Sequence, residues 1–383
     1  VNEVIPSLKM EREQGIDIVV VPSENRIYKD EEYAALDIPL TTDLSDRELL
    51  LGIKEVKINE LVADKTYCFF AHVIKAQPYN HDLLMALLEK NIRHIDYEVM
   101  TDEKGRRLIA FGYYAGMVGA HNGIWAYGKR TGEFELPRMN ECFDYAAAVD
   151  VYKETKLPPF KVVLTGTGRV GKGAAKVLED MGIRKVNPGA FKKETFDYPV
   201  YTQLECRDYV KRKDGGEFHK QDFYQHPTEY TSKFQSFTTV ADIMINGIYW
   251  DNDAPAFFTK EEMAQDNFTI QTIADVTCDI APVASIPSTL KASTIADPVF
   301  GYDPATNQEV AAFNTDYIDV MSVDNLPSEL PRDASEAFGQ MFIDKILPEF
   351  SKTRSQLLLR GTVTLNGDLG PNFEYLRDYK DGK

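Results

Sequence analysis

Short apolar runs alternate with amphipathic segments over the first third of the chain. Four runs have the length and composition of strands, at residues 16–22, 49–53, 67–71 and 94–100. Apolar residues at helical spacing predict two helices, at residues 5–14 and 82–90. Because strands that alternate with helices tend to pair in parallel, the pattern predicts an α/β layer structure.

A second α/β unit is predicted after a long connecting helix. Residues 111–127 (FGYYAGMVGAHNGIWAY) place small and aromatic side chains at helical spacing, so we expect a helix that packs closely through its glycines. The segment 156–161 (KLPPFK) separates this region from the next strand. Residues 334–350 (ASEAFGQMFIDKILPEF) predict an amphipathic helix that returns the chain to the first domain.

The length of 383 residues fits two domains better than one. We expect two Rossmann-like domains with parallel sheets. Residues 112–330 would form one domain, and residues 1–111 together with 331–383 would form the other.

Composition narrows the function classes. The net charge of -17 argues against sequence-independent binding to nucleic-acid phosphates, which requires a basic surface. Four singly spread cysteines argue against structural zinc and disulfides, so we expect no metal site and a reducing, cytoplasmic setting. The sequence shows no signal peptide and no apolar spanning run, and we expect a soluble protein without a membrane partner.

The glycine-rich segment 160–173 (FKVVLTGTGRVGKG) carries the strongest chemical signal. An apolar run leads into Gly166, Gly168 and Gly171 at GxGxxG spacing, and a predicted helix follows. In this context the first glycine permits a tight turn, the second lets backbone N–H groups approach a pyrophosphate, and the third allows close helix packing. The triphosphatase motif GxxxxGK[ST] is excluded, since Gly173 replaces its Ser or Thr. We therefore predict a dinucleotide site.

The choice between NAD and NADP stays open at this point. After the predicted strand at 198–204 comes Glu205, which favours the ribose hydroxyls of NAD. Arg207, supported by Lys211 and Arg212, favours the 2′-phosphate of NADP instead. A merely solvated charged turn is the third alternative.

Ionisable residues follow two apolar runs of the first domain. LLLGI precedes Lys54, and YCFFA precedes His72, with Lys75 and Gln77 just beyond. The carboxyl ends of parallel strands line ligand sites, so these positions suit working residues. A His and a Lys can exchange the protons of imine chemistry, although ordinary exposed side chains would give the same pattern.

Two adjacent guanidiniums, Arg106 and Arg107, follow the predicted turn at 102–105. They could bind a carboxylate or a pyrophosphate, or simply belong to an exposed hairpin turn. His121 fits packing inside the long helix, and His219 and His226 lie in a polar stretch typical of the surface.

Several segments together resemble one family. They are FFAHVIKAQ (69–77), KGRRLIAFG (104–112), LTGTGRVGKGA (164–174), INGIYW (245–250), DVTCD (275–279), VDNLPSELPRDASEAFG (323–339) and NGDLGPNFEYL (366–376). In this order they resemble saccharopine dehydrogenases, and more closely the lysine-ketoglutarate reductase domain of bifunctional lysine-degrading enzymes. Alanine dehydrogenase and the transhydrogenase α subunit are wider relatives.

The resemblance implies an active site in a cleft between an alanine dehydrogenase N-terminal-like substrate domain and a dinucleotide domain. The implied reaction condenses lysine with 2-oxoglutarate to saccharopine, or reverses this, with NAD or NADP. Lys54 and His72 would be the acid–base pair. The implied substrate residues are Lys75, Gln77, Glu98, Arg107, Phe111, Thr277, Cys278 and Asp279. The cofactor residues, with those implied by the glycine motif and the charged turn, are Arg106, Gly166, Gly168, Arg169, Val170, Gly171, Glu205, Arg207, Tyr249, Val276, Val323, Asp324, Asn325 and Leu326.

Two differences from the family leave alternatives open. The family opens with a strand that carries a substrate-binding Arg, whereas this sequence begins at or inside the following helix. We expect either an upstream start or a substrate site without that Arg. The residues after Asp279, IAPVASIPST, are similar to those of fungal lysine-forming enzymes. The alternatives are an alanine dehydrogenase-like enzyme and a non-catalytic nicotinamide-binding protein, and a homo-oligomer is an open alternative to a monomer.

Overall fold

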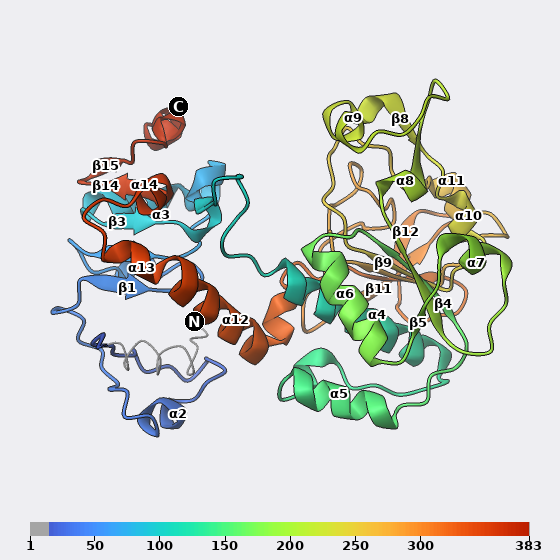
Figure 1. Ribbon diagram of the computed structural model, residues 1–383, viewed down its shortest axis with the longest axis horizontal. Helices are drawn as coiled ribbons and strands as arrows, with labels where there is room; N and C mark the ends of the chain where they lie inside the picture. Colours follow the sequence, from blue (N-terminus) through green and yellow to red (C-terminus); the bar gives the residue numbers. More distant parts are fainter. Residues whose placement is uncertain (1–14, 383) are drawn as a thin grey trace. The chain divides into compact units, whose positions relative to one another are not determined.

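The computed structural model describes residues 15–382, and the predicted helix at 5–14 lies outside this range. The chain divides into two compact units. Unit 1 comprises Val1–Ala110 and Pro331–Lys383, and unit 2 comprises Phe111–Leu330. Unit 1 therefore joins the blue and red ends of the chain, and unit 2 holds the middle (Figure 1).

The sheet of unit 1 has the strand order β1-β2-β3-β14-β15. Its strands are β1 (Leu49–Leu51), β2 (Thr66–Cys68), β3 (Arg93–Ile95), β14 (Thr362–Leu365) and β15 (Asp368–Leu369). The first three are parallel and in register, and β14 and β15 are antiparallel. The α/β character and the parallel pairing that the sequence predicts are confirmed.

Three predicted strands of unit 1 are wrong in extent. The runs at 67–71 and 94–100 leave the sheet after Cys68 and Ile95, and each is followed by a 3₁₀ turn, at Val73–Lys75 and at Tyr97–Val99. Apolar side chains continue past both strand ends because the residues directly after the strands, 69–71 and 96–98, are buried, and a buried loop can have the same composition as a buried strand. The run at 16–22 makes a single bridge, Val20 to Leu40, rather than a strand of the sheet.

The helices of unit 1 are α2 (Asp30–Ala34), α3 (His81–Glu89), α12 (Pro331–Lys345), α13 (Leu347–Phe350), α14 (Gln356–Gly361) and α15 (Arg377–Lys380). The helix predicted at 82–90 is confirmed as α3, whose Leu84 and Leu87 are fully buried. The helix predicted at 334–350 is divided into α12 and α13. Pro348 explains the break, since it has no N–H to donate to the preceding turn.

Unit 2 holds an eight-stranded sheet with the order β12-β11-β13-β10-β9-β4-β6-β5. The strands are β4 (Lys161–Thr165), β5 (Arg184–Lys185), β6 (Val200–Leu204), β9 (Ile243–Asn246), β10 (Thr272–Asp275), β11 (Val299–Asp303), β12 (Gln308–Val310) and β13 (Ile318–Met321). Neighbouring strands pair in parallel, except that β11 is antiparallel to both β12 and β13. The chain builds one side of β4 first and then crosses to β9, which creates the switch point where open α/β sheets bind ligands.

Close packing of two helices defines the core of unit 2. A Cβ atom on Gly116 of α4 (Gly112–Thr131) would lie 1.9 Å from the carbonyl oxygen of Val170. A Cβ on Gly173 of α6 (Arg169–Asp180) would lie 1.9 Å from that of Tyr113. The prediction that the long helix packs through its glycines is confirmed. The remaining helices are α5 (Tyr145–Glu154), α7 (Pro188–Lys193), α8 (Cys206–Tyr209), α9 (Lys220–Gln225), α10 (Gln235–Thr238) and α11 (Lys260–Met263).

A small two-stranded sheet, β7 (Val210–Arg212) with β8 (Tyr230–Ser232), lies in the long connection between β6 and β9. Among residues 15–382, no helix is long and apolar enough to cross a bilayer.

His121 is a structural residue of α4. It is fully buried, its Nε2–H donates to the carbonyl oxygen of Pro137 at 2.8 Å, and its Nδ1 accepts from the Tyr152 hydroxyl at 2.6 Å. Burial, opposed in part by the bond to Pro137, lowers its pKa from 6.5 to about 4. The expectation that this histidine packs inside the helix is confirmed.

We predict that His121 makes the protein less stable in mild acid. Between pH 6.5 and 4 the unfolded chain binds a proton here that the folded protein does not, so stability should fall with pH by about 1 kcal/mol per unit. His121→Gln lacks this titration. Urea unfolding at pH 7 and pH 5 should therefore show wild type losing its advantage over the variant as the pH falls. An advantage that is independent of pH would contradict this.

Candidate active site

Three adjacent strand ends of unit 1 bring ionisable side chains to one edge of the sheet. Lys54 and Glu55 follow β1, His72 follows β2, and Asp96 directly follows β3. The three strands are parallel and in register, so their carboxyl ends coincide. The structure thus brings together ionisable side chains from residues that lie far apart in sequence.

His72 and Glu55 form the closest ion pair of this edge. The Nδ1 atom of His72 lies 2.5 Å from Oε1 of Glu55, and both side chains are partly exposed. Burial by itself raises the pKa of Glu55, but its own backbone N–H, His72 and Lys54 outweigh this and lower the pKa below its usual value. Because Glu55 accepts the Nδ1 proton, Nε2 is the nitrogen that can exchange a proton with a substrate.

The turn after β2 has an unusual backbone. His72 and Ala76 have φ angles of 57° and 51°, in the left-handed region, and they flank the 3₁₀ turn η2 (Val73–Lys75). Non-glycine residues with such angles are uncommon, and they cluster at functional sites. This geometry carries His72, Lys75 and Gln77 within six consecutive residues.

A buried carboxylate supports the same turn. Asp96 is fully buried and accepts hydrogen bonds from the backbone N–H groups of Ala71 (3.2 Å) and Glu98 (2.8 Å). Burial raises the pKa of Asp96 to about 6, and the two N–H donors oppose the rise. Since Ala71 directly precedes the left-handed His72, Asp96 fixes the start of the turn.

Glu98 forms ion pairs with two cationic side chains of the site. Its side chain is 8% exposed, and its Oε1 atom lies 3.0 Å from Arg107 and 3.6 Å from Lys75. The cation side chains themselves are about half exposed, at 52% and 47%. Both can therefore reach a bound anion. Arg106 turns away from this cluster and pairs with Asp102 at 2.8 Å, within the turn that precedes it.

The glycine loop of unit 2 fits a pyrophosphate. Gly166 has φ +95°, and a Cβ on Gly171 would lie 2.1 Å from the carbonyl oxygen of Gly166, so neither position accepts a side chain. A Cβ on Gly168 would meet nothing within 4 Å. Gly168 caps the twelve-residue helix α6, whose first N–H groups face this open space. Arg169 begins α6, and Val170 packs beside Gly112 and Gly247.

A chain of buried polar groups links three strand ends beside this loop. The Thr165 hydroxyl donates to Asn246 at 2.7 Å, and the Asn246 amide donates to Asp275 at 2.9 Å. Asp275 also accepts from the Thr289 hydroxyl and from the backbone N–H of Cys278. Burial raises the pKa of Asp275 to about 6, against the hydrogen bonds that it accepts.

The turn after β10 holds the predicted Thr277, Cys278 and Asp279. Cys278 has φ +56°, and burial raises the pKa of its thiol to about 12, which disfavours the thiolate. Thr277 donates to the carbonyl oxygen of Ile248 at 3.0 Å, and burial raises the pKa of Asp279. The structure places these three residues together at the carboxyl end of β10.

The other predicted cofactor residues of unit 2 differ in exposure. Tyr249 is 96% exposed, and Asp324 and Asn325 are exposed as well. Val323 and Leu326 are buried, and a Cβ on Gly119 would meet Val276 and Leu326. Phe111 is half-buried and caps α4.

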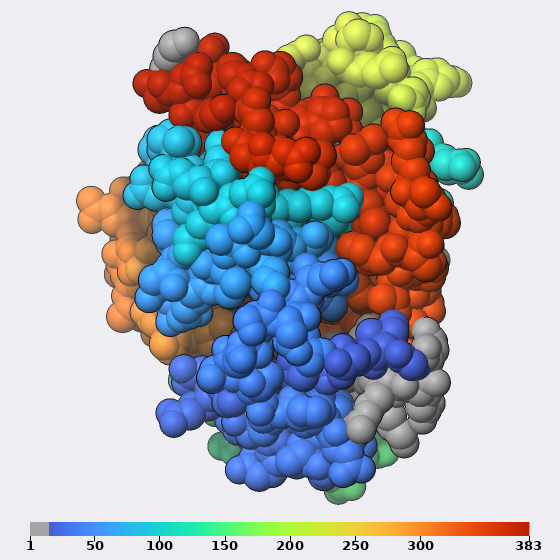
Figure 2. Space-filling model, turned by 90° about the vertical axis from the view of Figure 1, so that its left-hand side faces the viewer, coloured from blue at the N-terminus to red at the C-terminus, as the bar shows by residue number. Residues whose placement is uncertain are grey.

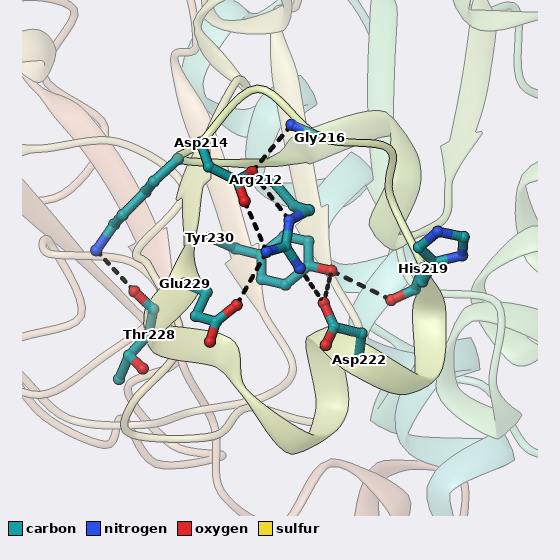
Figure 3. Close-up of polar contacts among 9 residues, drawn as sticks. Arg212, Asp214, Gly216, His219, Asp222, Thr228, Glu229 and Tyr230 are labelled. Carbon is teal, nitrogen blue, oxygen red and sulfur yellow. Dashed lines mark hydrogen bonds and ion pairs between the residues drawn. The ribbon is translucent and has the colours of Figure 1, made fainter.

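The charges after β6 are already engaged with one another. Arg207 lies 2.8 Å from Glu205. Arg212 is held by three carboxylates, Asp214, Asp222 and Glu229, at 2.6 to 3.1 Å (Figure 3). The guanidinium of Arg212 thus cross-links the β7–β8 lobe, and its part in binding a 2′-phosphate stays a prediction.

Comparisons with known proteins show what the chain resembles. Residues 7–118 match the family model described as "Alanine dehydrogenase/PNT, N-terminal domain". The chain is 28% identical over 420 residues to mitochondrial alpha-aminoadipic semialdehyde synthase of Mus musculus, which covers 96% of this chain and 45% of the relative. It is 27% identical over 353 residues to saccharopine dehydrogenase [NAD(+), L-lysine-forming] of Yarrowia lipolytica, covering 87% of this chain and 84% of that protein.

The chain is thus similar to alpha-aminoadipic semialdehyde synthases and to saccharopine dehydrogenases. It spans less than half the length of the semialdehyde synthases that it matches. Its fold is similar to that of L-alanine dehydrogenase, with a TM-score of 0.64 at 14% identity over 99% of this chain and 96% of the other. That likeness shows the shared architecture of two Rossmann-like units.

Two residues of the strand edge of unit 1, Glu55 and Asp96, are not among the site residues predicted from the sequence. The rule that strand ends carry chemistry applies to the predicted strand at 94–100, but that run was expected to continue through Asp96. A predicted strand that ended at Ile95 would have placed Asp96 at a strand end.

We predict different effects for substitutions of two glycines in the glycine loop. Gly171→Ala should destabilise the protein by about 1–3 kcal/mol in urea unfolding, because the methyl group collides with the carbonyl oxygen of Gly166. Gly168→Ala, whose φ of -77° suits alanine, should unfold like wild type. It should nevertheless bind NADH at least ~10-fold more weakly in a fluorescence titration, since its methyl group fills the pyrophosphate space. Unchanged NADH affinity would show that the loop binds no dinucleotide.

Proposed function

We propose that this protein is a nicotinamide-dependent oxidoreductase that interconverts saccharopine with lysine and 2-oxoglutarate. The observation that carries the proposal is the pair of His72 and Glu55 at the strand edge that also presents Lys54. Its named relatives include enzymes of this activity.

The charges of unit 1 support an anionic substrate. Lys75 and Arg107 are half-exposed cations in a chain of net charge -17. A buried Glu98 holds both in place, and Lys54 is exposed after β1. Saccharopine and 2-oxoglutarate carry several carboxylates, which Arg binds bidentately and Lys binds as a point charge.

The chemistry of these side chains fits imine formation. The substrate ammonium must lose a proton before its nitrogen attacks the keto carbon, and Nε2 of His72 is suited to accept it. The carbinolamine then loses water, for which Lys54 can supply a proton to the leaving oxygen. A bound reduced nicotinamide supplies the hydride for the imine. Glu55 holds the His72 ring through its Nδ1 atom.

For the cofactor we propose NAD. Glu205 directly follows β6, where an acidic residue contacts the ribose hydroxyls in dinucleotide folds. Arg207 is paired with this carboxylate, and Arg212 is committed to its own network. Neither guanidinium is poised for a 2′-phosphate.

A cofactor-oxidation assay tests the proposal. We expect lysine with 2-oxoglutarate to oxidise NADH, and at least ~10-fold less efficient use of NADPH, because Glu205 repels a 2′-phosphate. Pyruvate with ammonia should give no turnover. Turnover with pyruvate and ammonia alone would refute the proposed substrates and identify an alanine dehydrogenase-like enzyme.

His72→Gln provides the residue-level control for this assay. The turnover number should fall by about 10²–10⁴-fold, the usual contribution of a general acid–base group. The dissociation constant of NADH, measured by fluorescence, should stay unchanged, since the glycine loop lies in unit 2. A large loss of NADH affinity would show that the role of His72 is misassigned.

A further inference from the structure

The turn that carries His72, Lys75 and Gln77 has little support of its own. Its backbone bonds run from Lys75 N–H to the His72 carbonyl and from Ala76 N–H to the Val73 carbonyl, each 3.1 Å long, and from Asn80 N–H to the Gln77 carbonyl at 3.0 Å. Left-handed residues at both ends make this conformation unfavourable in isolation. Contacts from elsewhere in unit 1 must therefore hold it.

Two tyrosines from the C-terminal segment supply such contacts. The Tyr375 hydroxyl donates to the Ile74 carbonyl oxygen at 3.0 Å, and the Tyr379 hydroxyl donates to that of Gln77 at 2.6 Å. The two acceptors lie within and just after the turn. The donors come from η8 (Glu374–Leu376) and α15, some 300 residues along the chain.

The C-terminal segment is anchored well enough to act as a fixed support. Phe373 and Leu376 are buried in the same core as Val73, and Lys380 and Arg377 both pair with Asp368. In Figure 2 the red end of the chain lies over the cyan residues of this unit. The phenol groups are thus held by a core and not by the turn that they contact.

Tyr375 contributes little to packing, since its side chain is 63% exposed. An effect of its substitution on activity would therefore reflect the position of the turn and not the stability of the fold. The phenol pKa of Tyr375 is raised, chiefly by partial burial and then by the charges of Asp96 and Glu98.

We infer that Tyr375 and Tyr379 are positioning residues, which hold the turn so that the His72 ring and the Gln77 side chain keep their orientation. The inference rests on the proposed function for the roles of His72 and Gln77. Removing one hydroxyl leaves a carbonyl that water can solvate, so folding is preserved while the turn gains freedom. Small misplacements of a catalytic group are costly to rate.

Tyr375→Phe and Tyr379→Phe test the inference in the full chain. Tyr198→Phe is the matched control, since Tyr198 is a partly buried tyrosine of unit 2 whose hydroxyl makes no hydrogen bond with the described residues. We expect faster hydrogen–deuterium exchange at residues 72–77 in both test variants and not in the control. Thermal midpoints should match wild type.

Kinetics then distinguish the two tyrosines. With lysine, 2-oxoglutarate and NADH, Tyr375→Phe should lower kcat about tenfold and shift the pH–rate profile, with an unchanged KM for NADH. Tyr379→Phe should mainly raise the KM for 2-oxoglutarate, because Gln77 moves. Restoring the hydroxyl by back-substitution should restore each value.

The outcomes separate this inference from the proposed function. Exchange and kinetics equal to those of Tyr198→Phe would overturn the positioning role. A second outcome is faster exchange at 72–77 in the variants while even the wild type turns over neither lysine with 2-oxoglutarate nor pyruvate with ammonia. That result would support the positioning contacts and refute the proposed function.

Discussion

Each unit depends on a fully buried aspartate at the end of a parallel strand. Asp96 follows β3 and Asp275 ends β10, and burial raises the pKa of both to about 6. An unpaired buried carboxylate is too costly to keep, so each one collects hydrogen bonds. One donor in each case is the backbone N–H of a turn with a left-handed residue, at Ala71–His72 and at Cys278. Satisfying the buried charge therefore shapes the turn.

The turns that the buried aspartates stabilise also position the residues of the candidate site. In unit 1 the turn carries His72, and Glu98 holds two cations beside it. The acidic surplus of the chain makes these cations informative, because they gather at one strand edge against the overall charge. In unit 2 the corresponding network ties the glycine loop to the turn after β10, through Thr165 and Asn246.

The features that the sequence predicted are those that depend on residues close together in the chain. The glycine loop follows from a turn, a close approach and a helix start within consecutive residues, and the order of strands and helices follows from periodicity. The predicted domain limits differ by one residue from those of the compact units. The pairing of His72 with Glu55 and the support from Tyr375 could not be predicted. They depend on register between separate strands and on contacts across some 300 residues. The position of Asp96 at a strand end could not be predicted either, because the buried apolar run around it has the pattern of a strand.

The central claim is that the side chains at this strand edge join an amine to a keto acid. Mass spectrometry of the product tests it most directly, with the ε-nitrogen of lysine labelled with ¹⁵N and with unlabelled 2-oxoglutarate and NADH. The account predicts one product whose mass is the sum of the two substrates less one oxygen atom, with the label in the new secondary amine. Labelled glutamate, or no product joining the two substrates while NADH is consumed, would contradict it.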